Sequence, residues 1–255
     1  MFREGQAVIT RREDYQAPAF LIDSVDLVFD LEPAKTRVLN TMQIRRNPDL
    51  AAQALKLDGE ELNLSRVLVN GQGTSFKMDG DQLVLENLPE GNEAFKLEIF
   101  TTCNPSKNTQ LTGLYMSQDS FFTQCEAQGF RRISYFLDRP DVMSTFTTCV
   151  VADEARYPIL LSNGNAVARG REVDGRHWVR WEDPFRKPCY LFALVAGNLA
   201  CVEDSFTTSS GRAITLRIFV EDKDVDKCDH AMLSLKNAMA WDEKSMAANT
   251  ISTFS

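Results

Sequence analysis

Histidine is scarce in this sequence, which limits the metal chemistry that it can support. Among 255 residues there are only two histidines, His177 and His230. Neither belongs to a His-Glu-x-x-His pair, the spacing that places two imidazoles on one helix face around zinc. Cys228 and Asp229 adjoin His230, but consecutive helical residues diverge by about 100° and do not converge on one ion. We therefore predict no metal site within this chain.

Paired cysteines, long apolar runs and a basic excess are also absent. The six cysteines are scattered without a Cys-x-x-Cys pair, which favours reduced thiols in a cytoplasmic protein. No window approaches the roughly 18 apolar residues of a membrane-spanning helix, and no secretory signal is visible. The formal net charge of -8 argues against nucleic acid or an anionic membrane as a partner. These features predict a soluble cytoplasmic protein that binds neither.

Signatures of nucleophilic catalysis and of phosphate binding are missing as well. The sequence has no Gly-x-Ser-x-Gly motif, and the glycine-containing stretches 70–73 and 209–212 resemble plain turns, without the lysine and helix of a phosphate-binding loop. Acidic residues number 36, so chance carboxylate pairs are expected. The sequence therefore disfavours a glycosidase, which needs two specific carboxylates at a defined separation.

Most of the chain has the period-two pattern of half-buried strands. Val25, Leu27, Phe29 and Leu31 alternate with mostly polar residues, and turn signals separate this run from similar ones. Residues 181–190 contain two prolines and are interpreted as a rigid extended link. The other predicted strands are 37–44, 62–69, 83–85, 95–101, 145–151, 158–161, 166–172, 176–181, 190–196 and 214–220. The pattern predicts an antiparallel sandwich or saddle.

The pattern changes after residue 198, which we predict to be a domain boundary. Residues 1–198 would form the β domain, and residues 199–255 would contain strands followed by one helix. Asp224 can cap this helix, which is predicted to end near Lys244. Its apolar residues at helical spacing are Met232, Leu235 and Met239. Residues 245–255 are small and polar and are predicted to be a frayed tail.

Residues 123–140 (TQCEAQGFRRISYFLDRP) have neither a helix period nor a strand period. They combine two carboxylates, three arginines, two glutamines and three aromatic rings. One interpretation is a packed turn at a domain edge in which Asp138 pairs with the arginines. The other makes Glu126 an anionic anchor for an ammonium group, in a partly dry pocket. Gln124, two residues away on the same strand face, would line that pocket too.

Several blocks of the sequence resemble the zinc-dependent aminopeptidase N family, in the form typical of bacterial alanyl aminopeptidases. The signature runs from QCEA at 124–127 through Arg131 and Arg132 to LDRPD at 137–141. The likeness covers essentially residues 15–244. Further matching blocks are LSNGN at 161–165, WEDPF at 181–185, KPCYLFALVAG at 187–197 and SLKNAM at 234–239.

The resemblance implies a saddle-shaped β domain packed on a thermolysin-like catalytic domain, with a large helical domain beyond. Family members remove single residues from the amino termini of peptides. The glutamate that matches Glu126 binds the free α-ammonium group in such enzymes, and the glutamine that matches Gln124 lines the pocket for the first side chain. Fixing the amino end in this way would set which peptide bond is cleaved.

Parts of the family pattern do not occur in this sequence. The metal helix, the Gly-Ala-Met-Glu-Asn loop and the tyrosine that stabilises the tetrahedral intermediate have no counterpart, so we assign no catalytic residue. We expect an amino-terminal β saddle domain at 1–198 and the truncated start of the catalytic domain at 199–255, with a nonmatching tail from about residue 245.

This expectation sets the cofactor and the partners. Zinc is expected in the full-length family enzyme but not in this chain, which alone would not hydrolyse peptides. The expected partners are a peptide amino terminus and the missing catalytic and helical domains. The alternative is a noncatalytic β-sandwich that serves as a binding or interaction module.

Overall fold

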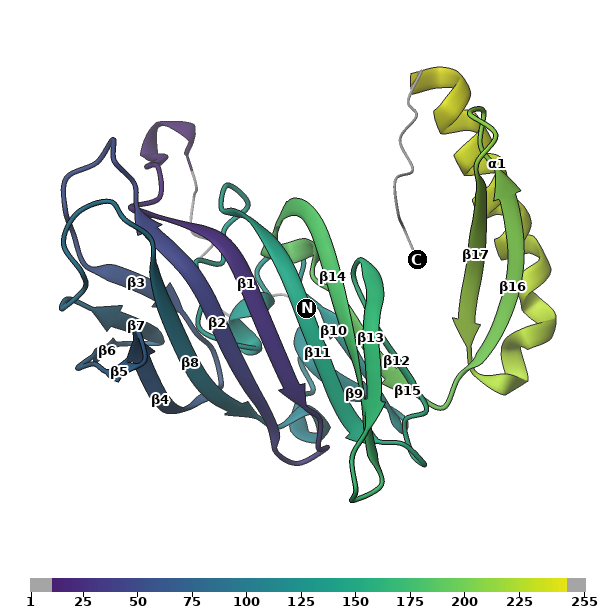
Figure 1. The fold of residues 1–255 in the computed structure, drawn as a ribbon, viewed down its shortest axis with the longest axis horizontal. Coiled ribbons are helices and arrows are strands. Elements are labelled where there is room, and N and C mark those ends of the chain that lie inside the picture. The colour runs from purple at the N-terminus through teal and green to yellow at the C-terminus, as the bar shows by residue number, and fades with distance from the viewer. Residues whose placement is uncertain (1–10, 247–255) are drawn as a thin grey trace.

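The computed structural model describes residues 11–246, which form mainly β-structure with one long helix near the end of this range. Figure 1 shows a broad sheet with further strands packed against it, and a hairpin with a helix that stands to one side. The mainly β fold class predicted from the sequence is confirmed.

The largest sheet has eight strands in the order β13-β14-β11-β1-β2-β8-β4-β5. It is antiparallel, as predicted, apart from β1 and β11, which run parallel. A parallel pair needs a crossover connection, and the long excursion of the chain between β1 and β11 supplies it. The strands are β1 (Phe20–Asp30), β2 (Thr36–Arg46), β4 (Asn63–Val69), β5 (Gln72–Gly73), β8 (Phe95–Cys103), β11 (Met143–Asp153), β13 (Asn165–Arg171) and β14 (Arg176–Pro188).

Three smaller sheets and several short helices complete the fold. The four-stranded sheet has the order β12-β15-β10-β9, the three-stranded sheet the order β3-β7-β6, and β16 pairs with β17. Their strands are β3 (Leu55–Asp58), β6 (Lys77–Asp79), β7 (Gln82–Leu85), β9 (Gly113–Ser117), β10 (Ser120–Gln124), β12 (Ile159–Ser162), β15 (Leu194–Gly197), β16 (Ala200–Thr207) and β17 (Ala213–Val220). The helices are the 3-10 helices η1 (Arg12–Asp14), η2 (Pro105–Lys107), η3 (Phe130–Arg132), η4 (Cys189–Leu191) and η5 (Asp222–Lys227), and α1 (Cys228–Met246).

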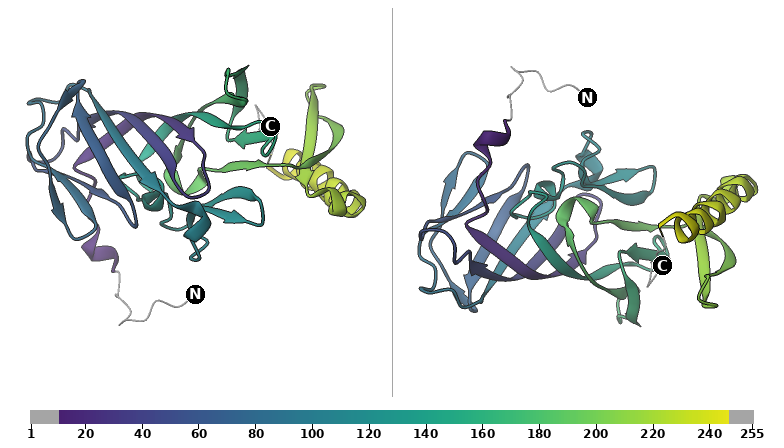
Figure 2. Two further views of the ribbon diagram at one scale, coloured as in Figure 1. Left: turned by 90° about the horizontal axis from the view of Figure 1, so that it is seen from below. Right: turned by 90° about the horizontal axis from the view of Figure 1, so that it is seen from above.

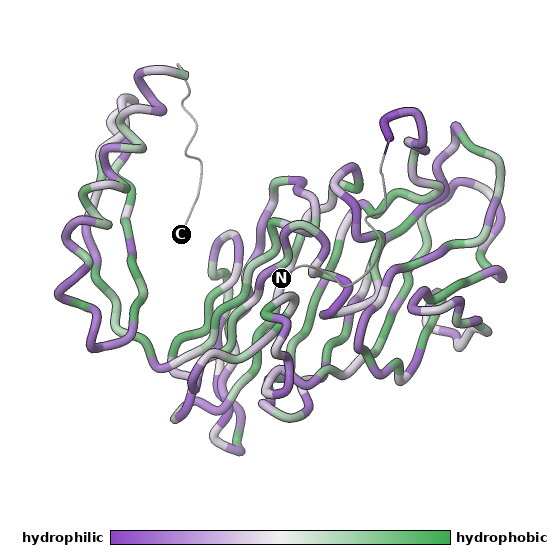
Figure 3. Tube along the Cα trace, turned by 180° about the vertical axis from the view of Figure 1, so that it is seen from behind, coloured by the Kyte–Doolittle hydropathy of each residue, from purple (hydrophilic) through white to green (hydrophobic). Residues whose placement is uncertain are grey.

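The main core lies between the eight-stranded sheet and the four- and three-stranded sheets. Val25, Leu27 and Phe29 of β1 are at most 1% exposed, as their alternation with polar residues predicts. They belong to one hydrophobic cluster with Leu57 of the three-stranded sheet and Phe121 of the four-stranded sheet. Figure 3 shows hydrophobic stretches concentrated along these strands. A hydrophobic core buried between two layers of strands is characteristic of a β-sandwich.

The predicted strand at 190–196 is only partly correct. The structure places η4 at its start and confines the strand to β15. The side chain of Asn163 accepts a hydrogen bond from the backbone N–H of Ala193 (2.6 Å) and donates one to the carbonyl of Leu191 (3.1 Å). These backbone groups are therefore satisfied by a side chain, and the ladder begins only at β15.

The proline-containing stretch 181–190 is extended as far as Pro188, as predicted. Its extended part belongs to β14 and pairs with β11, where Lys187 lies opposite Ser144 and Pro188 lies opposite Met143. Proline lacks an N–H group and is found at strand ends or edges. Pro188 is the last residue of its strand, so it ends the ladder there.

The hairpin β16–β17 and helix α1 form a unit with its own small core. Leu216, Met232 and Met239 are buried there and pack with Phe206 and neighbouring apolar residues. Both views in Figure 2 show this unit apart from the sandwich, to which one connecting segment joins it. The arrangement is compatible with a boundary after residue 198, which stays a prediction.

The predicted helix is confirmed with different limits. Asp224 does not cap α1, because it lies within η5 and its carboxylate pairs with Lys227. The helix also continues past Lys244 to Met246, so the first two residues of the predicted tail are helical. The rest of that tail lies outside the described residues.

Candidate functional site

Residues 123–140 lead from β10 of the four-stranded sheet towards β11 of the eight-stranded sheet through a tight turn. The chain leaves β10 at Gln124, turns through residues 126–129 and enters η3. Gly129 donates its backbone N–H to the carbonyl of Cys125 (2.7 Å), which closes the turn. A Cβ atom on Gly129 would lie 2.4 Å from the carbonyl oxygen of Gln124, so only glycine fits there.

Aromatic side chains anchor this segment in the core. The ring of Phe130 contacts the rings of Phe136, Phe192 and Phe146, with centroid separations of 4.8, 5.4 and 6.2 Å. All three pairs have the edge-to-face arrangement that the ring quadrupoles favour. Phe130 and Phe136 are fully buried. The rings therefore fix the position of η3 against the large sheet.

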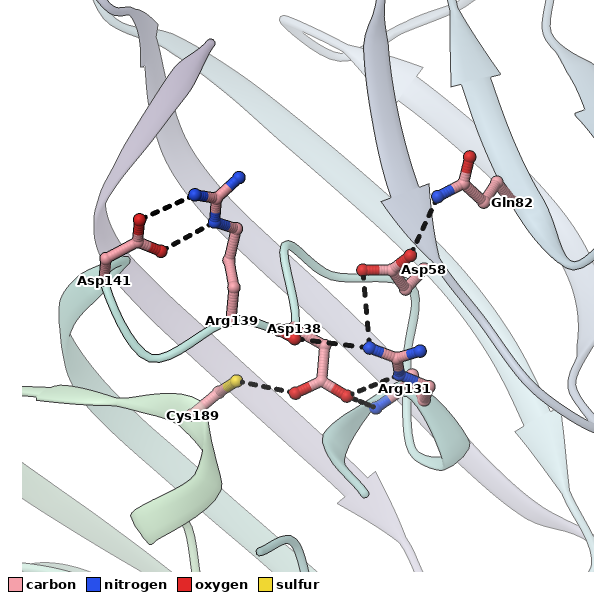
Figure 4. Close-up of polar contacts among 7 residues, drawn as sticks. All are labelled: Asp58, Gln82, Arg131, Asp138, Arg139, Asp141 and Cys189. Atoms are coloured by element: carbon pink, nitrogen blue, oxygen red, sulfur yellow. Dashed lines mark hydrogen bonds and ion pairs between the residues drawn. The ribbon is translucent and has the colours of Figure 1, made fainter. Parts of the chain in front are cut away.

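Asp138 is buried within the same segment and pairs with Arg131, as Figure 4 shows. Its side chain is 1% exposed. One carboxylate oxygen accepts hydrogen bonds from the backbone N–H of Arg131 (3.2 Å) and from its Nε (2.8 Å). The other accepts from the thiol of Cys189 (3.2 Å). Burial and the charge of Asp138 raise the pKa of the Cys189 thiol, so this group keeps the proton that it donates.

Arg131 also links this segment to the three-stranded sheet. Its guanidinium lies 3.7 Å from the carboxylate of Asp58, which accepts a hydrogen bond from Gln82 (2.9 Å). Asp58 exchanges two backbone hydrogen bonds with Phe136, at 2.8 and 3.0 Å. β3 is therefore joined to residues 123–140 by the ion pair of Asp58 with Arg131, drawn in Figure 4, and by the backbone bonds of Asp58 with Phe136.

The remaining arginines of the segment are also paired. Arg132 contacts the carboxylates of Glu60 (2.5 Å) and Glu61 (2.8 Å). Arg139 binds Asp141 through two contacts of 2.6 Å, and the hydroxyl of Tyr15 donates to the same carboxylate (3.0 Å). The hydrogen bonds from Arg139 hold the pKa of Asp141 below its ordinary value. The first interpretation is therefore correct in part: the turn is packed and Asp138 pairs with Arg131, but Arg132 and Arg139 pair with carboxylates outside residues 123–140.

Gln124 and Glu126 lie close together at the end of β10. The side-chain Nε2 of Gln124 donates a hydrogen bond to the backbone carbonyl of Glu126 (3.3 Å). They do not share a strand face, because β10 ends at Gln124 and Glu126 lies in the turn that follows. Both residues are exposed, so residues 11–246 do not enclose them in the partly dry pocket that was predicted.

The carboxylate of Glu126 differs from the other acidic groups of the segment. Asp138 and Asp141 each pair with an arginine. Glu126 makes no side-chain hydrogen bond or ion pair with any residue in the range 11–246 that the structure describes. Its charge is therefore available to a ligand.

A hollow of about 390 Å³ lies near this segment but away from the two predicted site residues. It is open to solvent, and its lining does not include Gln124 or Glu126. The lining residues are Asp58, Gly59, Glu60, Asp81, Gln82 and Arg131. Sequence reasoning missed the contribution of β3 and β7 to this region, because those residues are distant in sequence and carry no motif.

Within residues 11–246, no group of three histidine, cysteine, aspartate or glutamate side chains is placed to hold a metal ion. The helices of the described range include none that is long and apolar enough to cross a membrane. The side chains of residues 11–246 therefore do not fit a zinc ion, and no chemical step through zinc can be assigned to them.

Comparison with known proteins places the β-sandwich among peptidase domains. The family model described as the Peptidase M1 N-terminal domain matches residues 21–191. Aminopeptidase N of Escherichia coli (strain K12) is 50% identical over 234 residues, which are 91% of this chain and 26% of that protein. Aminopeptidase N of Haemophilus influenzae is 45% identical over 233 residues, with 91% and 27% covered. The chain belongs to the Peptidase M1 N-terminal domain family, and it spans about a quarter of the length of these relatives.

Solved structures agree with this assignment. Legionella pneumophila aminopeptidase A in complex with aspartic acid has a TM-score of 0.89 and 33% identity, and the match covers 95% of this chain and 29% of that one. A Deinococcus radiodurans M1 zinc metallopeptidase mutant bound to a Tyr-Ser-Ala substrate has a TM-score of 0.68 at 16% identity, with 80% and 48% covered. The second likeness shows the fold alone.

Proposed function

We propose that this chain is the amino-terminal part of an aminopeptidase N-type metallopeptidase and that it recognises the free amino end of a peptide. Glu126 binds the α-ammonium group, and Gln124 borders the first side chain of the substrate. Hydrolysis requires the remaining length of the enzyme. Membership of the M1 family supports the reaction class.

The unpaired carboxylate of Glu126 is the observation that carries this proposal. Three arginines lie within 13 residues after it along the chain, and all of them contact other carboxylates. An ammonium group can therefore approach Glu126 without displacing an internal partner. Gln124 holds the backbone carbonyl of Glu126, which fixes the start of the turn.

The strength of this interaction depends on how dry the site is. An ion pair exposed to water contributes only about 0.2–1 kcal/mol, so the chain alone binds an amino end weakly. Truncating one partner of a desolvated charge pair weakens the binding free energy by about 2–5 kcal/mol. We infer that a second wall, contributed by the rest of the enzyme, removes water from Glu126.

A hybrid enzyme tests the proposed role of Glu126. Residues 11–246 replace the matching part of Escherichia coli aminopeptidase N, and kcat/KM is measured with alanine para-nitroanilide. The Glu126→Gln variant keeps the shape of the side chain and removes its charge. We expect kcat/KM to fall roughly 30-fold or more, which corresponds to about 2 kcal/mol or more.

Glu93→Gln is the matched control, because Glu93 is an exposed glutamate on the loop that precedes β8. It loses the same charge and should keep the activity of the parent hybrid. Equal activity of the Glu126→Gln variant and the parent hybrid would refute the assignment of Glu126.

The alternative function, a noncatalytic β-sandwich that binds a partner, is favoured by the surface of α1. Leu233, Trp241 and Met246 on this helix are 57%, 62% and 68% exposed. Exposed apolar side chains of this size on one helix suit a protein contact. A hybrid without aminopeptidase activity, despite normal folding, would favour this alternative. The cytoplasmic location stays a prediction.

A further inference from the structure

Asp138 is the most deeply buried carboxylate in the described part of the chain, with 1% of its side chain exposed. A buried carboxylate lowers stability unless its oxygens accept hydrogen bonds. Both oxygens do so, from Arg131 on one side and from Cys189 on the other. An apolar residue at this position would avoid the cost of desolvating a carboxylate, so stability alone does not account for Asp138.

Asp138 is connected to the turn that carries Glu126 through η3 and a series of hydrogen bonds. Arg131 is the second residue of η3, and its backbone N–H is one of the groups that a short helix leaves without an internal partner. From there the backbone bonds continue toward the turn: Arg132 donates to the carbonyl of Gly129 (3.0 Å), and Gly129 donates to that of Cys125 (2.7 Å). Asp138 thus fixes one end of a short chain of bonds, whose other end lies beside Glu126.

The turn has little freedom to move independently of η3. The backbone of Gly129 lies so close to Gln124 that a Cβ atom would be 2.4 Å from the Gln124 carbonyl. A Cβ atom on Gly113, which pairs with Gln124 across the hairpin, would lie 2.5 Å from the Cβ of Arg132. A shift of η3 is therefore transmitted to the end of β10 at Gln124 and to the turn at residues 126–129.

We propose that Asp138 is a positioning residue for amino-end recognition: it holds η3 through the backbone and guanidinium of Arg131, and so sets where Glu126 stands. The thiol of Cys189 is its second donor. This inference rests on the proposed function of Glu126. Asp138 contacts no substrate, and its effect passes through Arg131 and the turn.

The first experiment measures the turn directly in this chain. Amide hydrogen exchange is followed in the parent and in Asp138→Asn, which keeps the size of the side chain and removes the charge. Exchange at the amides of Gly129, Arg131 and Arg132 should accelerate by roughly 10-fold or more, since a hydrogen bond to a charged group is lost. The amides in the middle of β1 and β2 should keep their rates.

The second experiment asks whether Asp138 acts through Glu126. KM and kcat for alanine para-nitroanilide are measured in the hybrid enzyme for Asp138→Asn, Glu126→Gln and the double variant. Displacing Glu126 from the amine should raise KM roughly 10- to 100-fold with a smaller change in kcat. In the Glu126→Gln background the same change at Asp138 should have almost no further effect, because coupled residues are not additive.

Three further variants keep the test decisive if Asp138→Asn folds poorly. Cys189→Ala removes one donor and should raise KM in the same direction by a smaller factor, and Cys189→Ser, which retains a donor, should restore the parent value. Asp141→Asn is the matched control. This variant removes the charge of a paired carboxylate just after residues 123–140. Asp141 bonds Arg139 and Tyr15 rather than η3, so the effect on KM should be independent of Glu126.

The outcomes separate this inference from the proposed function. An inactive parent hybrid, or an unchanged kcat/KM in Glu126→Gln, would overturn both. A loss of activity in Glu126→Gln, together with equal effects of Asp138→Asn in both backgrounds, would leave the proposed function standing and refute the positioning role. Faster exchange spread evenly over the whole sandwich would refute it as well.

Discussion

Phe130 joins the hydrophobic core to the candidate site, and its truncation gives the sharpest test of the structure. The side chain is 0% exposed, and three phenylalanine rings surround it at centroid separations of 4.8 to 6.2 Å. Truncating a buried phenylalanine to alanine costs about 3–5 kcal/mol in lost transfer free energy and cavity formation. For a domain of this size that corresponds to a lower Tm by roughly 6–20 °C.

The Tm is measured by near-ultraviolet circular dichroism, which reports the packing of aromatic side chains in the sandwich. Phe76→Ala serves as the control, because that ring is 44% exposed and its loss should change the free energy of unfolding by less than about 0.5 kcal/mol. A Phe130→Ala protein with a Tm within about 3 °C of the parent would show that η3 is not packed as the structure has it.

Three other predictions follow from local geometry. Gly164 and Gly175 have positive φ angles of 88° and 85°, but a Cβ atom on Gly164 would lie 2.2 Å from a backbone oxygen of β14, whereas Gly175 has open space. Denaturant titration should show that Gly175→Ala loses about 1–2 kcal/mol of unfolding free energy and Gly164→Ala clearly more; equal losses would contradict the close approach. The lowered pKa of Asp141 means that its pairing with Arg139 stabilises the fold above about pH 4 and loses this effect as the pH falls through the folded pKa. The difference in Tm between the parent and Arg139→Gln should therefore shrink below about pH 4, and a constant difference would refute the assignment. Among the described residues, the unit of β16, β17 and α1 has a core of three buried hydrophobic residues, so limited proteolysis should cut residues 199–255 first. Resistance equal to that of the sandwich would count against this prediction.

The strands that the sequence predicted well are those with long alternation and one buried face. In β1 the inward residues Val25, Leu27 and Phe29 are almost completely buried, because period-two alternation and burial on one sheet face have the same geometric origin. The short strands β3, β9 and β10 were missed, although β7 and β12, with four residues each, were predicted, so alternation over four or five residues is an unreliable guide. β16 was missed because most of its side chains are exposed, so that mainly its pairing with β17 defines it.

The candidate site was predictable in part. The unusual composition of residues 123–140 and the family resemblance directed attention to Gln124 and Glu126, and the structure brings these two residues into contact. The partners of the arginines were only partly predictable. Arg131 pairs with Asp138 seven residues away, but Arg132 pairs with Glu60, 72 residues earlier in the chain. No local pattern encodes a contact of that separation, because it depends on how the three-stranded sheet docks.

The composition of residues 123–140 follows from two opposed requirements on one segment. Phe130 and its neighbouring rings must fill the core, whereas the backbone that follows the turn needs charged partners such as Asp138 to satisfy its polar groups. Each arginine then neutralises a carboxylate that the fold places nearby.

Had the arginines served to neutralise the whole segment, one of them would contact Glu126. Because none does among the described residues, this position keeps its negative charge, and the net charge of -8 adds a long-range attraction for cationic groups. An ammonium group is the ligand chemistry that complements an uncompensated carboxylate held at a fixed point.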